Sequence, residues 1–157
     1  MADTTVLTRE VEDFVRAHLA EQHGQAFGKR FLVLRTGGKH EFDAVSEDGS
    51  IIASIKAHSG RTSGGNIPSG KIFACIAELY YLSLANAPTR LLVLTNPQFF
   101  EIFKRKMREA VVDGVAIEHI PLSAELQNKV DLVVEKASQE MSHAREVAEA
   151  EVETEIT

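Results

Sequence analysis

The sequence predicts an α/β fold, a mixed β-sheet flanked by helices, with elements in the order αβββαβαβα. Three observations predict it. Apolar residues recur at helical spacing near both ends of the chain, polar and apolar residues alternate on either side of an Asp-Gly pair, and residues 91–94 form a continuous apolar run. We divide the 157 residues into an α/β domain over 1–122 and a C-terminal helix with an acidic tail over 123–157.

The first helix is expected at residues 5–22, ending before Gly24. Its apolar face includes His18, which we expect to be packed in the core, and the positions at helical spacing are Leu7, Val11, Phe14, Val15, His18 and Leu19. A short apolar strand is expected at residues 31–34, ending at the Gly37-Gly38 pair.

A β-hairpin should follow, because residues 41–45 and 53–58 both alternate between polar and apolar side chains. The connection over residues 46–50 contains Asp48-Gly49, which supplies the backbone conformations that a tight turn needs. Residues two apart share a face of a strand, so Glu41 lies beside Asp43, and Ser54, Lys56 and His58 lie together. The register that would join the two polar faces is left open.

The second half of the chain alternates helices with strands. Residues 58–70 are rich in Gly, Ser and Thr and are expected to form an exposed loop. A helix is predicted after it over residues 70–86, capped by Ser69, with an apolar stripe that includes Phe73, Ile76 and Tyr80. The elements predicted next are a buried strand over 90–95, a helix that begins at Asn96 and Pro97, a strand over 115–120 and a long helix from Ser123.

Composition excludes several classes of protein. No run of apolar residues is long enough to span a membrane, and residues 1–8 lack the features of a secretory signal, so we expect a cytoplasmic protein. A single cysteine, Cys75, allows neither an intrachain disulfide nor a cysteine-rich zinc site, and it is expected to be buried. Residues 1–112 carry a net charge of +2 and residues 113–157 a net charge of −8, so the body of the protein does not repel nucleic acid.

The hairpin carries the chemistry. Asp43 and Lys56 on adjacent strands can form a simple cross-strand ion pair, or they can hold a divalent metal beside a phosphodiester. A helix precedes this hairpin, and a helix and an apolar strand follow it. In this order of elements and in the hairpin residues, the chain resembles the PD-(D/E)XK nuclease superfamily, which has the restriction-endonuclease-like fold. The resemblance covers residues 8–96. It implies that Asp43 binds Mg²⁺ or Mn²⁺, that Lys56 stabilises charge or helps to activate water, and that Glu12, with Glu10 in reserve, is the first-helix glutamate.

The chain departs from the family at Ser54, where Glu or Asp is usual. A neutral hydroxyl is a weaker ligand for a hard cation than a carboxylate is. Two replacements are available, Glu41 on the same strand face as Asp43 and Glu78 in the following helix. If one of them compensates, we expect a metal-dependent enzyme that hydrolyses nucleic-acid phosphodiester bonds. The alternative is a catalytically degenerate member of the same fold that binds nucleic acid or serves as a subunit of an assembly.

The expected partner is nucleic acid, DNA in preference to RNA, contacted by Arg61, Lys71 and His58 near the site. Residues 65–71 match the spacing of a phosphate-binding loop, but Ile72 stands where that motif needs Ser or Thr, so we expect no nucleotide site. The basic residues between Lys104 and Arg108 form either a solvated helix face or a binding patch. The second half of the last helix is expected to be either a dimer-forming coiled segment or a frayed acidic tail.

Overall fold

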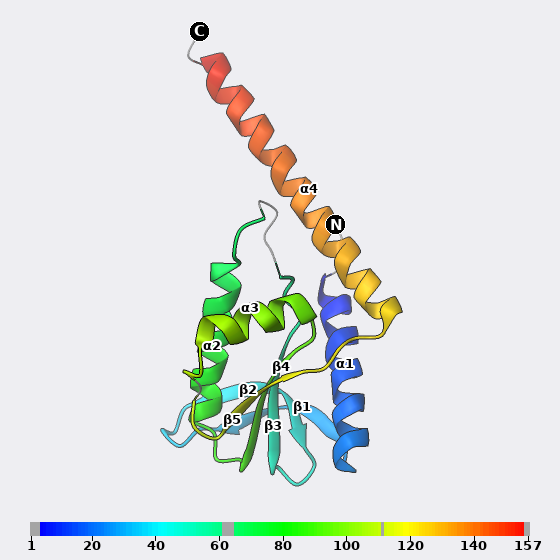
Figure 1. The fold of residues 1–157 in the computed structure, drawn as a ribbon, viewed down its shortest axis with the longest axis vertical. Coiled ribbons are helices and arrows are strands. Elements are labelled where there is room, and N and C mark those ends of the chain that lie inside the picture. Colours follow the sequence, from blue (N-terminus) through cyan, green and yellow to red (C-terminus); the bar gives the residue numbers. More distant parts are fainter. Residues whose placement is uncertain (1–3, 61–64, 111, 156–157) are drawn as a thin grey trace.

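The structure, a computed structural model, describes residues 4–60, 65–110 and 112–155 (Figure 1). Its elements are α1 (Thr4–His23), β1 (Phe27–Val33), β2 (Lys39–Ser46), β3 (Ile51–Lys56), α2 (Ser69–Ser83), β4 (Thr89–Leu94), α3 (Pro97–Met107), β5 (Val115–His119) and α4 (Ala124–Glu155). The predicted α/β class and element order are confirmed. No helix among the described residues is long and apolar enough to cross a membrane.

The five strands lie in the sheet in sequence order. β1, β2 and β3 form an antiparallel meander, whereas β3, β4 and β5 run parallel. Parallel neighbours need a crossover connection, and α2 and α3 provide the two crossovers. Both crossover helices pack on one face of the sheet, as connections of the same hand to successive neighbouring strands require.

Two hydrophobic cores cover the two faces of the sheet. Phe42, Ile52 and Leu92 pack with α2 and α3, while Ala53, Ile55 and Val93 pack with α1 and the start of α4. The sheet is therefore the middle layer of three. The second half of α4 extends away from this body (Figure 1), and its side chains over residues 139–150 are exposed.

Local signals explain how the elements begin and end. Gly49 has a φ of +74° in the β2–β3 turn, where Asp48 Oδ1 accepts hydrogen bonds from the Ser50 amide and hydroxyl and from the Ser46 hydroxyl. These hydrogen bonds lower the pKa of Asp48 to about 2. The Asn96 side chain caps α3 by accepting from the Phe99 amide at 2.9 Å. The predicted turn and cap are both confirmed.

Two details of α1 and α2 differ from the sequence predictions. His18 is exposed rather than packed, because the buried face of α1 is the narrow line Val11, Val15 and Leu19, and His18 lies one helical position away from it. Ser69 is the first residue of α2 and does not cap it, since Pro68 occupies the cap position and makes no side-chain hydrogen bond.

Apolar runs also over-predicted burial. Phe31 and Val33 are 64% and 60% exposed, because β1 is an edge strand with one face uncovered. On α2, the described structure buries Ile72, Cys75, Leu79 and Leu82 and leaves Phe73, Ile76 and Tyr80 in solvent. The expected burial of Cys75 is confirmed, and burial raises the pKa of its thiol to about 12.

Candidate functional site

Asp43 lies where β2 departs from regular alternation. Its neighbours Phe42 and Ala44 pack into the cores on opposite faces of the sheet, and the β2–β3 pairing covers Ala44 and Val45 but not Asp43. The Asp43 side chain takes the place of a backbone carbonyl in the pairing of β2 with β3. Its Oδ2 accepts a hydrogen bond from the Ile55 amide at 2.8 Å. This bond answers the open question of register: it fixes Asp43 on the backbone of the residue between Ser54 and Lys56.

Burial raises the pKa of the Asp43 carboxyl above its ordinary value of 3.8. The hydrogen bond from Ile55 and the charges of Lys56 and Lys29 act in the opposite direction, and the negative charge of Glu12 adds to the increase. The charged form of Asp43 is thus held in an environment that does not fully compensate it. A cation placed beside it would be bound favourably for that reason.

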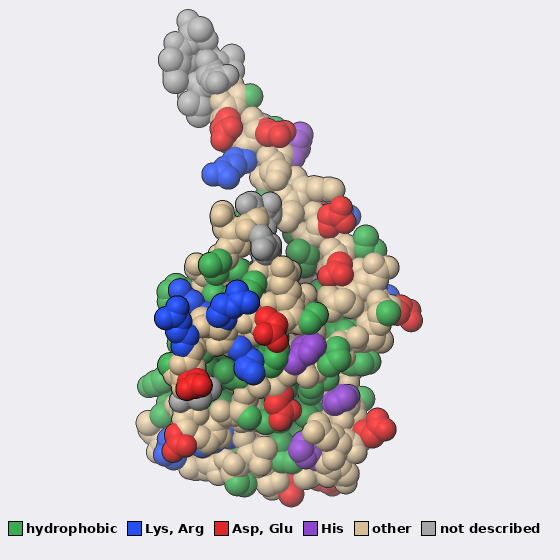
Figure 2. Space-filling view, in the orientation of Figure 1, with side chains coloured by type: hydrophobic (Ala, Val, Ile, Leu, Met, Phe, Trp, Pro, Cys, Tyr) green, Lys and Arg blue, Asp and Glu red, His purple; other side chains and the backbone are tan. Residues whose placement is uncertain are grey.

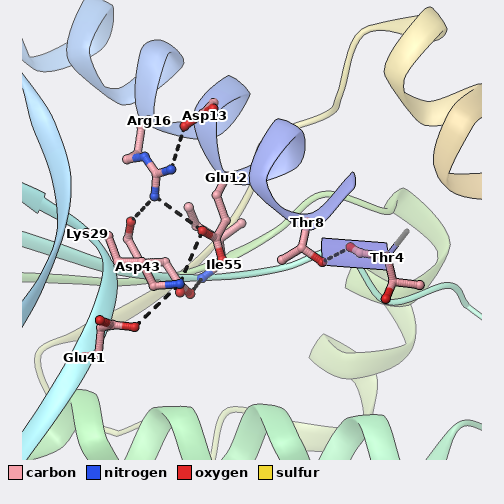
Figure 3. A network of polar contacts seen from close by, with 9 residues as sticks. All are labelled: Thr4, Thr8, Glu12, Asp13, Arg16, Lys29, Glu41, Asp43 and Ile55. Atoms are coloured by element: carbon pink, nitrogen blue, oxygen red, sulfur yellow. Dashed lines mark hydrogen bonds and ion pairs between the residues drawn. The ribbon is translucent and has the colours of Figure 1, made fainter. Parts of the chain in front are cut away.

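Glu12 of α1 belongs to a polar network around Asp43 (Figure 3). Only 9% of Glu12 is exposed, and its Oε2 lies 3.5 Å from Arg16 Nη1 and 3.6 Å from Lys29 Nζ. Arg16 Nη1 also donates to the backbone carbonyl of Asp43 at 2.6 Å, which ties α1 to β2. The structure therefore brings the predicted Glu12 and Asp43 together.

Glu78 occupies the other side of Lys56. Its Oε2 accepts a hydrogen bond from Ser54 Oγ at 2.9 Å, and its Oε1 lies 3.5 Å from Lys56 Nζ. His40 Nε2 of β2 is 3.4 Å from the same Glu78 carboxylate. Of the two predicted replacements for the missing strand carboxylate, Glu78 lies at Ser54, whereas Glu41 lies 3.6 Å from Lys29 Nζ instead.

A cavity of about 340 Å³ opens on the Asp43 side of the site. Its polar lining comes from Glu12, Asp43, Lys56 and His58, and its apolar lining includes Val130 and other side chains of α1 and α4. The candidate catalytic groups therefore face one hollow.

The other predicted binding residues fall in different places. Lys71 Nζ donates to Ser59 Oγ at 2.9 Å, close to the end of β3, and burial lowers the pKa of its ammonium group. Glu10 is 3.6 Å from Lys129 Nζ and ties α1 to α4, away from the site cavity. Arg61 lies outside the described residues.

His58 is half-buried at the edge of the site. Burial, with smaller contributions from the charges of Lys56 and Lys71, lowers its pKa to about 4. Its ring meets the Phe99 ring edge-on at 5.4 Å, and its Nε2 has no hydrogen-bond partner within the described part of the chain. The prediction that His58 contacts nucleic acid therefore concerns an uncharged imidazole at neutral pH.

Asp43 and Glu12 are the carboxylates that the cavity offers to a divalent cation. Among residues 4–60, 65–110 and 112–155, no three His, Cys, Asp or Glu side chains are grouped so as to hold a metal. Mg²⁺, however, commonly takes one or two carboxylates and completes its shell with water and substrate phosphate. Asp43 and Glu12 both line the cavity, and the Lys29 ammonium lies 3.6 Å from Glu12 and 3.6 Å from Glu41.

Sequence reasoning missed three residues of the site. Arg16 follows Glu12 by one helical turn, so the spacing of an i, i+4 ion pair was the available signal. His40 and Lys29 carried no such signal, because they reach the site through the β1–β2–β3 register and the packing of α2.

Comparison of the chain with models of protein families, with curated protein sequences and with solved structures finds no match.

Proposed function

We propose that this protein is a metal-dependent phosphodiesterase of the PD-(D/E)XK type, with the restriction-endonuclease-like fold, acting on nucleic acid. One observation carries the proposal: the Glu78 carboxylate lies against both Ser54 and Lys56, at 2.9 Å and 3.5 Å. It returns a negative charge to the strand position where the motif lacks one. The sheet order and the parallel β3–β4 pair after the meander support the same fold.

Each residue has a role that its contacts support. Asp43 and Glu12 would hold the Mg²⁺ or Mn²⁺, whose chemistry when bound is to lower the pKa of a water and to neutralise charge on the phosphate. Lys56 presents a positive charge to a phosphate oxygen, and Glu78 holds the Lys56 ammonium in place. Asp43 is held by the Ile55 amide, so the carboxylate needs little rearrangement to bind a cation.

The test is cleavage of single-stranded and double-stranded substrates with Mg²⁺ or Mn²⁺. We expect Lys56→Ala and Asp43→Asn each to lower the rate by about 10²-fold or more, since each removes a charge that acts on the reacting phosphate. Lys39→Ala, which removes an exposed lysine at the start of β2, is the matched control. Equal cleavage by the wild type and both site variants would show that any activity comes from elsewhere.

A second candidate is a non-catalytic nucleic-acid-binding or assembly subunit of the same fold. The ion pairs of the site favour this second function. Lys29 and Arg16 already neutralise Glu12, and Lys56 neutralises Glu78, so these carboxylates have cationic partners without a metal ion. Calorimetric titration with Mn²⁺ separates the two functions. Binding that Asp43→Asn abolishes supports the enzyme, and no heat of binding at millimolar Mn²⁺ supports the non-catalytic subunit.

A further inference from the structure

A second cavity of about 710 Å³ lies outside the candidate catalytic cavity. One wall is the chain on both sides of the β3–α2 loop, including Gly60 and Ile67, and the other is the C-terminal half of α3, with Ile102, Arg105, Lys106 and Arg108. We call it the α3 cavity. Figure 2 shows Lys and Arg side chains gathered over α3. Within the described chain, no ion pair engages Arg105, Lys106 or Arg108.

The α3 cavity begins close to the catalytic residues. Lys56 ends β3, and Gly60, at the cavity wall, is four residues further, which is at most about 14 Å along an extended chain. Lys71, bonded to Ser59, adds a cation between the two. Gly60 packs against the Gln98 side chain at the start of α3, where a Cβ would clash, so the wall is held against the helix. Lys71 thus lies between Lys56 and the cations at the end of α3.

The helix dipole explains only part of this charge. Cations in a last helical turn are stabilised by the helix dipole, and Lys104, Arg105 and Lys106 lie in the last turn of α3. Arg108, however, lies at the C-cap in the left-handed conformation, with a φ of 44°, where glycine is the usual residue. Neither the helix dipole nor the backbone conformation therefore accounts for an arginine at this position.

The shape and lining distinguish between kinds of nucleic acid. Guanidinium and ammonium groups recognise phosphates. Beside them, Ile67 is 62% exposed and Ile102 is half-buried, so the cavity offers apolar surface next to charge. Base faces are available to apolar side chains only when the bases are unstacked, as in a single strand. A duplex presents two backbones on a convex surface, whereas this hollow has room for part of one strand.

We propose that the α3 cavity binds the single strand that runs into the catalytic cavity, with Arg105, Lys106 and Arg108 on its phosphates and Ile67 and Ile102 against its bases. The inference rests on the proposed function for the direction of the strand, but strand binding itself needs no cleavage. The lining holds no aromatic side chain among its described residues, so binding depends mainly on charge and falls steeply with salt. DNA and RNA single strands share the chemistry that it recognises.

The experiment measures fluorescence anisotropy of labelled 20-nucleotide single-stranded DNA, single-stranded RNA and duplex DNA with the full chain. All proteins carry Asp43→Asn and the buffer contains EDTA, so the result is independent of cleavage. We expect either single strand to bind at least 10-fold more tightly than duplex. Arg105→Ala with Arg108→Ala should weaken single-strand binding at least 10-fold and reduce the dependence on salt. Lys39→Ala with Lys136→Ala, which removes two exposed lysines that do not line the cavity, should change binding less than 2-fold.

Arg108→Gly separates binding from folding. It should leave Tm unchanged or higher, because glycine relieves the left-handed residue, and weaken single-strand binding about 3-fold or more, while Arg108→Lys should retain most of the affinity. The inference would be overturned if duplex DNA bound as tightly as the single strands. It would also be overturned if the Arg105/Arg108 double variant and the Lys39/Lys136 control lost the same amount of single-strand affinity. Cleavage unaffected by Lys56→Ala would instead refute the proposed function alone and leave the binding result standing.

Discussion

Asp43 is the residue at which folding and the proposed chemistry conflict. Its pKa is raised by burial, so the native protein binds a proton more readily than the unfolded chain does. Between the ordinary value of 3.8 and the raised native value, the stability of the protein therefore falls as pH rises, and the loss persists at neutral pH. Functional sites often hold such destabilising groups.

We expect Asp43→Asn to raise Tm by about 2–4 °C at pH 7.5, because the amide keeps an acceptor for the Ile55 N–H without burying a charge. The difference in Tm between the variant and the wild type should shrink as the pH is lowered, since the wild-type carboxyl takes up a proton more readily in the native protein than in the unfolded chain. Thermal melts over pH 4–8 check both expectations. A variant less stable than wild type at pH 7.5 would mean that attraction from Lys56 and Lys29 exceeds the cost of burial.

Glu78 is expected to substitute for the missing carboxylate at Ser54. Glu78→Gln should lower cleavage about 10²-fold, whereas Ser54→Ala, which keeps the Glu78 charge, should lower it less than 5-fold. The double variant Ser54→Glu with Glu78→Ala moves the charge back to β3 and should recover at least 10-fold over Glu78→Gln. Metal-dependent cleavage rates measure all three. No recovery in a folded double variant would mean that Glu78 acts through its contacts with Lys56 and His40 rather than as a replacement ligand.

At the scale of elements, α1 is held on the sheet by one side chain as well as by its apolar stripe. The Arg16 guanidinium donates to Asp43 O at 2.6 Å and to Asp13 at 2.7 Å, and lies 3.5 Å from Glu12. Because Arg16 contacts both the helix and β2, it positions Glu12 relative to Asp43.

Arg16→Ala should therefore lower the free energy of unfolding by about 1.5–3 kcal/mol, since it leaves a buried glutamate and a strand carbonyl without their donor. Urea denaturation measures the change. Arg9→Ala, which truncates an exposed arginine of the same helix, is the control and should change stability by less than about 0.5 kcal/mol. Equal effects of the two variants would show that the network around Glu12 contributes nothing to folding.

Elements were predicted well wherever a local signal existed. Asp48-Gly49 specified the turn, Asn96-Pro97 opened α3, and helical periodicity located α1, because turn chemistry, capping and amphipathicity act over a few residues. Burial was predicted poorly for Phe31 and Tyr80. Whether an apolar side chain is covered depends on whether its strand lies at the edge of the sheet and on which neighbours its helix has, and neither is local information.

At the scale of the whole molecule, α4 divides into two halves with different environments. Leu126 and Val130 belong to the core against α1 and the sheet, while the side chains over residues 139–150 are exposed and include Met141 at 70%. The first half is therefore part of the α/β body. We propose that the second half pairs with the same segment of another copy of the chain, with a frayed acidic tail as the alternative.

Removing residues 140–157 should change Tm by less than about 2 °C, because none of the side chains described there is buried. Light scattering coupled to size exclusion gives the state of assembly of both chains. A dimer that becomes a monomer on truncation supports pairing through α4, and a monomer in both cases supports the tail. A loss of more than 5 °C in a monomeric chain would show that the second half contributes to the body.

By itself, the sequence determined the α/β class, the order of nine elements, the hairpin with Asp43 and Lys56, and the two residues able to replace the carboxylate missing at Ser54. Hydrophobic periodicity, turn residues and helix caps depend on residues close together in the sequence, so they can be recognised before the fold is known. Only the tertiary structure showed that Glu78 lies against Ser54 while Glu41 lies beside Lys29, because these contacts depend on how α2 packs across the sheet. It alone also placed the basic end of α3 opposite the β3–α2 loop, since two segments 40 residues apart meet only when the sheet has formed.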